Sequence, residues 1–153
     1  MLFSLSFSRC RADIVTLQEV EMDQFYNFFL RELKRDGYEG IFSPKSRAKT
    51  MTDLERKRVD GCAIFYKTSK FNLIKDHLVE FNQLAMSLSQ SAESMNLQSN
   101  RNLLNRVMPK DNIALAALLE TKDSVWDASC VPSDPAQTRQ QILVSSRQNV
   151  QHS

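Results

Sequence analysis

The sequence predicts an α/β fold, because short strand patterns flank one strongly amphipathic helix pattern. Residues 12–20 begin with an apolar, β-branched run that ends at a carboxylate, Glu19. A run of this length and composition is typical of a buried strand. After Glu19 the apolar residues change to helical spacing. Further strand patterns follow at 38–42, 62–66, 71–81 and 141–144. A carboxylate at the open end of such a strand is where an α/β fold places a metal ligand.

The helix pattern covers the residues that follow Glu19. Its apolar positions recur every three or four residues, while most charged residues lie opposite. These apolar positions are Met22, Phe25, Tyr26, Phe29, Leu30 and Leu33. We expect this stripe to pack in the core, and we expect Gly37 to end the helix in the left-handed conformation that favours glycine.

The remaining strand patterns differ in how fully they are buried. The strand at 62–66 is apolar throughout, so Cys62 is expected to pack there as a small apolar residue. In the strand at 71–81 we place Phe71, Leu73, Val79 and Phe81 on one face and His77 on the surface.

Composition sets broad limits. The chain has 153 residues, 42% of them hydrophobic, which suits one domain with a sizeable core. A net charge of +2 does not by itself argue for nucleic acid. The three cysteines are odd in number and lack metal-type spacing, which suits a reducing compartment. No stretch is long enough for a membrane span, and the N-terminus lacks the pattern of a secretory signal.

Positive charge is concentrated in one short segment. Six basic residues fall between positions 45 and 58, against only Asp53 and Glu55. They are Lys45, Arg47, Lys49, Arg56, Lys57 and Arg58. The segment is either a solvated loop or a surface that attracts phosphate.

Five ordered sequence blocks resemble one enzyme family. The blocks are LQEVE at 17–21, FSPKSRAK at 42–49, ERKRVDGCAIF at 55–65, VEFNQ at 79–83 and NRVMPKDNI at 105–113. Together they are similar to the carbon catabolite repressor protein 4 type of cytoplasmic deadenylase, a nuclease of the endonuclease/exonuclease/phosphatase superfamily that shortens poly(A) tails. The first block alone is shared widely in that superfamily, whereas five blocks in order are specific.

The resemblance implies a partial four-layer α/β sandwich of the DNase I-like type, with two sheets flanked by helices. It implies an incomplete nuclease domain over 12–145, divergent tails at 1–11 and 146–153, and an exposed polar insertion at 87–102. It also places a central strand at 113–120, although the composition there would suit a helix. With only part of the sandwich, we expect a sheet face without a partner sheet, an unpaired edge at 141–144 and a tendency to aggregate.

The resemblance also implies the chemistry. Hydrolysis of an RNA phosphodiester needs a divalent ion, and magnesium prefers oxygen ligands. Glu19 matches the magnesium-binding carboxylate of the family, although a carboxylate at a helix start is the alternative. Lys45 matches a basic residue near the scissile phosphate, Arg47 is a weaker candidate beside it, and Asn112 is a candidate polar contact at the mouth of a central strand.

The implied parent activity is magnesium-dependent 3′-to-5′ hydrolysis of poly(A) RNA in a deadenylase scaffold complex, in the cytoplasm with the nucleus as an alternative. The family's first-strand asparagine, its aspartate–asparagine pair, its catalytic histidines and the leucine-rich repeat docking segment find no match in this chain. We therefore expect little activity from the chain alone. Two alternatives stay open: another phosphoesterase of the same fold, and a non-catalytic binding fragment.

Overall fold

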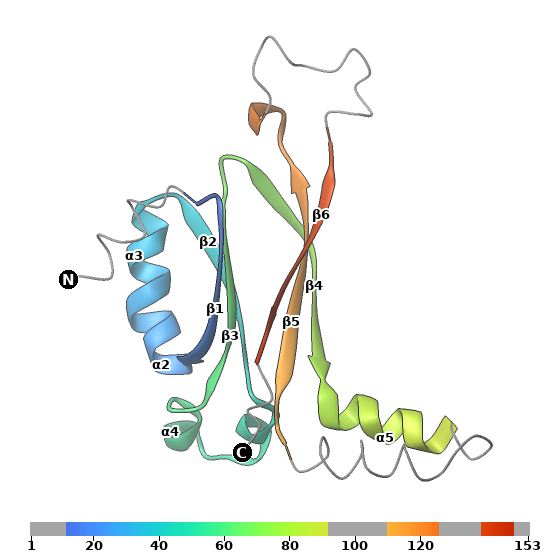
Figure 1. Cartoon of the computed structure of the whole chain (residues 1–153). Coiled ribbons are helices and arrows are strands. Elements are labelled where there is room, and N and C mark those ends of the chain that lie inside the picture. The colour runs from blue at the N-terminus through green and yellow to red at the C-terminus, as the bar shows by residue number, and fades with distance from the viewer. Residues whose placement is uncertain (1–11, 92–109, 126–138, 149–153) are drawn as a thin grey trace.

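Two three-stranded antiparallel sheets pack face to face, with one helical segment on the outer side of the first sheet (Figure 1). The computed structural model describes residues 12–91, 110–125 and 139–148. Sheet A has the strand order β1 (Ile14–Glu21), β3 (Asp60–Lys67), β2 (Tyr38–Pro44). Sheet B has the order β4 (Phe71–Glu80), β5 (Ile113–Thr121), β6 (Gln141–Arg147). The predicted α/β class and each predicted strand are confirmed.

The helical segment runs without a break from α2 (Met22–Gln24) through the π-helical turn η1 (Phe25–Phe29) to α3 (Leu30–Arg35). Phe25 and Leu33 are buried against Phe65 and other apolar residues of sheet A. The π turn widens the helix, and Tyr26 of the predicted apolar stripe is left 51% exposed. Gly37 follows with φ of 80°, as predicted, because glycine carries no Cβ to clash in that conformation.

Strand β3 holds the sandwich together because it is buried on both faces. Cys62, Ile64 and Tyr66 point into the core between the two sheets. Ala63 and Phe65 point the other way, into the core beneath the helix. A strand buried on both sides reads as a continuous apolar run, which explains why this element was predictable from the sequence.

The central strand of sheet B is β5. The family resemblance predicted a strand here, whereas the composition alone favoured a helix. Its burial alternates along the strand, with Ile113, Leu115, Ala117 and Leu119 buried against sheet A. Alternation of this kind requires a period of two residues, so β-sheet pairing on both sides overrides the helix propensity of alanine and leucine.

A register shift in β4 corrects the predicted face of that strand. The pairing with β5 is irregular between Leu73 and Lys75, which moves every later side chain to the opposite face. Leu78 therefore packs against the inter-sheet core. The prediction that Val79 shares a face with Phe71 and Leu73 is wrong. His77 is exposed, as predicted.

Two further expectations are corrected, and one stays a prediction. Sheets A and B cover each other with their facing sides, whereas the expectation of a sheet face without a partner sheet stays a prediction for their outer sides. The segment predicted as a basic loop contains the short helices η2 (Ser46–Thr50) and α4 (Asp53–Arg56). The polar tail expected from residue 146 is wrong for Ser146 and Gln148, which are buried.

A helix also replaces part of the expected polar insertion. Strand β4 ends at Glu80 and α5 (Phe81–Ser91) begins at the next residue and projects away from the sandwich (Figure 1). Residues 87–91 of the predicted insertion are therefore helical, and 92–102 lie outside the described residues. Phe81 belongs to this helix and not to the strand. Among the helices that the structure describes, none is long and apolar enough to span a membrane.

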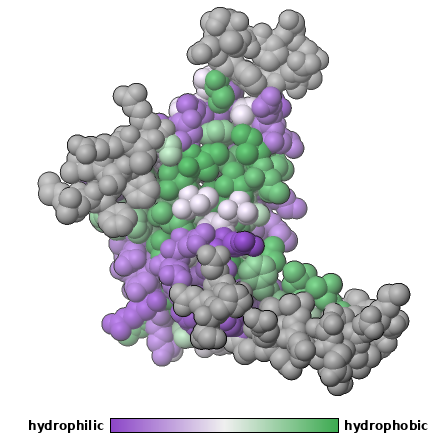
Figure 2. All heavy atoms as spheres, in the orientation of Figure 1, coloured by the Kyte–Doolittle hydropathy of each residue, from purple (hydrophilic) through white to green (hydrophobic). Residues whose placement is uncertain are grey.

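The surface is divided by polarity. Figure 2 shows apolar side chains over the upper part of the visible face, between the two sheets, and hydrophilic side chains toward the lower end, near α4. At that lower end β1, β2, β4 and β6 finish, while β3 and β5 begin. All of the predicted site residues lie in or next to the strand ends that meet there.

Candidate functional site

Glu19 lies at an irregularity in β1. Gln18 pairs with Cys62 and Val20 pairs with Gly61, so Glu19 is the extra residue of a β-bulge. Its φ is 56°, the one positive value outside glycine among the described residues. Its side chain is exposed. The bulge therefore presents the carboxylate to solvent while both neighbouring residues keep their places in the sheet.

A left-handed conformation is costly for glutamate. For an L-residue it costs about 1–2 kcal/mol, because Cβ approaches the following carbonyl oxygen. Bulges and residues with strained backbones are concentrated at functional sites, where they aim a side chain. The positive φ of Glu19 therefore lowers the stability of the fold. It supports Glu19 as a functional residue over the alternative of an ordinary carboxylate at a helix start.

Glycine at position 61 lets β2 come close to β3 beside this bulge. A Cβ at Gly61 would lie 2.1 Å from the carbonyl oxygen of Ser43 and 2.7 Å from Cα of Pro44. No real side chain tolerates such contacts, so only glycine permits this strand spacing. The end of β2 therefore lies tightly against the start of β3, and the next residue, Lys45, is brought to the same end of the sheet as Glu19.

Asp60, the first residue of β3, is the centre of an ion-pair network at this end. Its Oδ2 accepts from Lys45 Nζ at 2.7 Å and from Gln148 Nε2 at 3.0 Å. Its Oδ1 accepts from Arg47 Nη2 at 2.8 Å. Burial raises the pKa of Asp60, but the Lys45 hydrogen bond and the charges of Lys45 and Arg47 outweigh burial and lower its pKa below the ordinary value. The carboxylate is therefore held ionised.

Arg47 joins the two sheets at the same place. While Nη2 binds Asp60, Nη1 donates to Asp111 Oδ2 at 2.7 Å. The backbone N–H of Ser46 also donates to the Asp111 carbonyl at 3.4 Å. Asp111 is followed by Asn112, so the network places the predicted polar contact Asn112 beside the segment that carries Lys45 and Arg47. Both terminal nitrogens of Arg47 are engaged, which favours a bridging role for this side chain.

The basic segment is more nearly neutral in the fold than in the sequence. Lys49 Nζ lies 2.5 Å from Glu80 Oε2, at the end of β4. Thus Lys45, Arg47 and Lys49 each have a carboxylate partner, supplied by Asp60, Asp111 or Glu80. These acids lie 13 to 64 residues from their basic partners along the chain. All three fall outside the segment 45–58, so they are not among the two acids counted there. Lys45 keeps donors for a ligand oxygen, because an ammonium group carries three and Asp60 accepts from one position.

The metal-binding expectation rests on Glu19 alone within the described ranges. No group of three or more His, Cys, Asp or Glu side chains there could hold a metal ion. Magnesium is commonly held by one or two carboxylates together with waters and substrate phosphate. An exposed carboxylate at a strand end fits one such ligand position. Asp60 does not fit a second, because its two oxygens already accept three donors.

The sequence predicts Glu19, Lys45, Arg47 and Asn112 as site residues, and the structure adds two residues that hold some of them in place, Asp60 and Gln148. In the sequence Asp60 stands two residues before the apolar strand pattern at 62–66, and Gln148 falls within 146–153, which was expected to be a divergent tail. An acid directly before a strand that is buried on both faces was the available signal for Asp60. No local signal marks Gln148, because its partner is 88 positions away.

Comparisons with known proteins agree with this architecture. The sequence pattern of the Endonuclease/Exonuclease/phosphatase family matches residues 6–148. The chain is 49% identical over 137 residues to "CCR4-NOT transcription complex subunit 6-like-B" of Xenopus laevis, covering 90% of this chain and 23% of that protein. It is 53% identical over 111 residues to "CCR4-Not complex 3'-5'-exoribonuclease subunit Ccr4" of Mycosarcoma maydis, covering 72% and 16%. The chain thus spans less than a quarter of the length of these relatives.

A solved structure supports the fold. The human Nocturnin catalytic domain with bound sulfate anion superposes with a TM-score of 0.56 at 22% identity. The match covers 94% of this chain and 39% of that domain. Nearly all of this chain therefore corresponds to part of a larger fold.

Proposed function

Because the chain belongs to the Endonuclease/Exonuclease/phosphatase family, we propose that it forms part of a metal-dependent hydrolase that removes nucleotides from the 3′ end of poly(A) RNA. The observation that carries this proposal is the bulge at Glu19, which directs a carboxylate to the strand ends where a basic segment also lies. Relatives that are about half identical support the same reaction, because one of them is named as a 3'-5'-exoribonuclease subunit of the CCR4-Not complex and another as a subunit of the CCR4-NOT transcription complex.

In this proposal Glu19 is a ligand of the metal ion, and magnesium is the proposed ion. When bound, the ion supplies positive charge that offsets the charge on the phosphoryl oxygens and lowers the pKa of a bound water. Glu19 contributes an anionic oxygen, and the bulge turns this residue out of the regular pairing of the sheet, toward solvent.

Lys45 is proposed to bind a phosphate oxygen of the RNA. Its ammonium group is fixed by Asp60 and its side chain is only 17% exposed, so it loses little conformational freedom on binding. Arg47 contributes positive charge and rigidity beside it. Asn112 is proposed as a polar contact to the nucleotide, since its side-chain amide both donates and accepts.

Complex membership and location are proposed from the same resemblance. Relatives are named as subunits of the CCR4-NOT complex, and we propose that this chain functions in such an assembly. We propose the cytoplasm as its place of action, where deadenylases of this type shorten mRNA tails, with the nucleus as a second site.

A nuclease assay tests the proposal. A 5′-labelled oligoadenylate is incubated with the 153-residue chain in magnesium and, separately, in a chelator, with an oligouridylate of equal length for comparison. Because the described residues supply one ligand and no complete metal centre, we expect the chain alone to shorten the adenylate slowly, at a rate detected only at high protein concentration. Slow magnesium-dependent loss of single nucleotides from the 3′ end of the adenylate would support the exoribonuclease.

The same assay separates the alternatives. Shortening at ordinary nuclease rates would overturn the expectation of low activity. Release of a terminal phosphate without shortening would indicate another phosphoesterase of this fold. RNA binding without any hydrolysis, even at high protein concentration, would favour a non-catalytic binding role.

A further inference from the structure

Asp60 fixes one lysine through two separate groups. Its side-chain Oδ2 accepts from Lys45 Nζ at 2.7 Å, and its backbone carbonyl accepts from Lys45 N at 3.0 Å. Both ends of Lys45 are therefore tied to the first residue of β3. The Asp60 side chain is 18% exposed, so this pair lies largely out of contact with bulk water. Ion pairs that are screened from water hold their geometry better than exposed pairs.

The Asp60 carboxylate accepts two further hydrogen bonds, which hold the segment that carries Lys45 and Arg47 and join the two sheets. Oδ1 accepts from Arg47, which also binds Asp111 ahead of β5. Oδ2 accepts a second bond from Gln148, the residue after β6, which is buried. With three donors on two oxygens, most of the accepting capacity of the Asp60 carboxylate is used within the protein.

We propose that Asp60 is a positioning residue, which holds Lys45 and Arg47 in the arrangement that binds the RNA phosphate. The inference rests on the proposed function, because it assumes that the ligand of Lys45 is a phosphate. In this proposal Asp60 does not itself contact the reacting atoms. Its effect passes through the ammonium group of Lys45 and the guanidinium group of Arg47, which are pre-ordered by its two oxygens.

For the affinity of Asp60→Asn for RNA, the proposal and simple electrostatics predict changes in opposite directions. Removing one negative charge beside a phosphate site raises the local positive potential, which by itself tightens anion binding. Loss of positioning acts the other way, because two long basic side chains must then be ordered at the cost of binding free energy. Asp60→Asn keeps the size of the side chain, so the direction of the change in affinity decides between the two effects.

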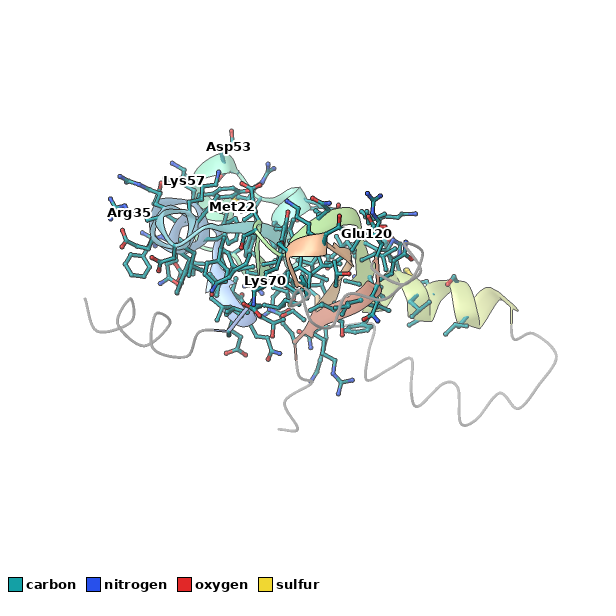
Figure 3. All side chains as sticks on the ribbon, turned by 90° about the horizontal axis from the view of Figure 1, so that it is seen from above. Met22, Arg35, Asp53, Lys57, Lys70 and Glu120 are labelled. Carbon is teal, nitrogen blue, oxygen red and sulfur yellow. The ribbon has the colours of Figure 1, made fainter. Side chains whose placement is uncertain are left out.

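Asp53 provides a matched control. It is the first residue of α4, its side chain is 96% exposed and it lies at the outer edge of the molecule in Figure 3. Its nearest ion-pair contact is Arg56 at 3.7 Å. Asp53→Asn removes the same charge from the same basic segment without releasing Lys45 or Arg47.

The first experiment measures the dissociation constant of a fluorescein-labelled oligoadenylate by anisotropy, in chelator, over a range of salt concentrations. We expect Asp60→Asn to weaken binding about tenfold, as for loss of one charge-assisted contact. The slope of log affinity against log salt should fall by about one, as it should for Lys45→Gln. Asp53→Asn should bind as tightly as the unaltered chain or slightly more tightly. Unchanged or tighter binding by Asp60→Asn would overturn the proposal.

A second readout does not depend on RNA. The Lys45 ammonium group should give a protected signal in a lysine-selective ¹H–¹⁵N spectrum, assigned by its loss in Lys45→Gln. We expect this signal to disappear in Asp60→Asn and to persist in Asp53→Asn; its persistence in Asp60→Asn would refute the positioning role. If the unaltered chain fails to bind RNA, the phosphate-binding function is refuted, and the ammonium signal alone then decides whether Asp60 holds Lys45.

Loss of folding in Asp60→Asn would not end the test. Asp60→Glu keeps the charge but moves the carboxylate by one methylene group, so electrostatics predict unchanged affinity. We expect weaker RNA binding and an altered Lys45 signal in this variant. Affinity and signal equal to those of the unaltered chain would contradict the proposal.

Discussion

The hydroxyl of Ser146 donates a hydrogen bond to the backbone carbonyl of Leu17, at 3.1 Å. This bond joins β6 of sheet B to β1 of sheet A two residues before Glu19. Ser146 is 1% exposed, so the carbonyl has no access to water through that side. The contact fixes the strand just ahead of the bulge, and it shows how the last described strand supports a residue near the beginning of the chain.

Removal of this bond should destabilise the fold. Ser146→Ala leaves the Leu17 carbonyl without its donor, at an expected cost of about 1 kcal/mol in the free energy of unfolding. Ser145→Ala is the control, because Ser145 is the preceding residue and is exposed. Urea denaturation of the two variants measures the difference. Equal stability would show that the Ser146 bond contributes nothing.

The strained backbone at Glu19 predicts a gain in stability when the side chain is removed. Glu19→Gly should stabilise the fold by about 1 kcal/mol, because glycine adopts positive φ without steric cost. For a chain of this size that corresponds to a rise in melting temperature of about 2–4 °C.

Glu21→Gly provides the comparison for that measurement. Glu21 has φ of −66° and ψ of 145°, an ordinary extended conformation, so glycine there should lower the melting temperature. Thermal melts of both variants show whether the direction of the change in melting temperature depends on the φ of the substituted residue. A lower melting temperature for Glu19→Gly would mean that the bulge is not strained.

The lowered pKa of Asp60 predicts a stability change in acid. Because its pKa is lower in the folded than in the unfolded state, its contribution is present above the unfolded value of about 3.9 and is lost as pH falls through the folded value. Asp60→Asn should therefore be less stable than the unaltered chain at neutral pH, and the gap should shrink below about pH 4. Denaturation between pH 3 and pH 7 tests this, and a constant gap would argue against the ion pair.

Burial predicts an unreactive thiol at position 62. Burial is the largest influence on Cys62 and raises its pKa, and its side chain is fully enclosed in the inter-sheet core. In a Cys10→Ser/Cys130→Ser background, Cys62 should react with an aromatic disulfide reagent only as fast as the protein opens, and rapidly in urea. Fast reaction of the folded protein would show that the two sheets separate readily.

The sequence predicted those elements that are determined by the residues within or next to them. Strand β3 was evident because both of its faces are apolar, and the end of the helix was evident because Gly37 meets a steric requirement. The shift in β4 after Leu73 was not predictable, since a bulge depends on how a partner strand is aligned. The composition of β5 favoured a helix, and only the family resemblance placed a strand there.

For the site, the sequence predicts which residues bear the chemistry but not how they are held, and those roles stay predictions. Glu19 could be named from the end of a strand and Lys45 from the family resemblance, but the left-handed backbone of Glu19 follows from pairing with β3. The role of Asp60 depends on Gln148 and Arg47, which reach it from other elements. Contacts of this kind are fixed by tertiary structure, so a single sequence does not reveal them.

The most direct test of the account places residues 12–148 in the full-length Xenopus laevis relative, of which the match to this chain covers 23%. We expect the chimera to shorten oligoadenylate from the 3′ end with a requirement for magnesium. Glu19→Gln keeps the size of the side chain but removes its charge, and should lower the rate at least about a hundredfold. His77→Gln, at an exposed position of β4, should leave the rate near that of the chimera. Full activity of Glu19→Gln at limiting magnesium, together with loss of activity in His77→Gln, would contradict the assignment of Glu19 as the metal ligand.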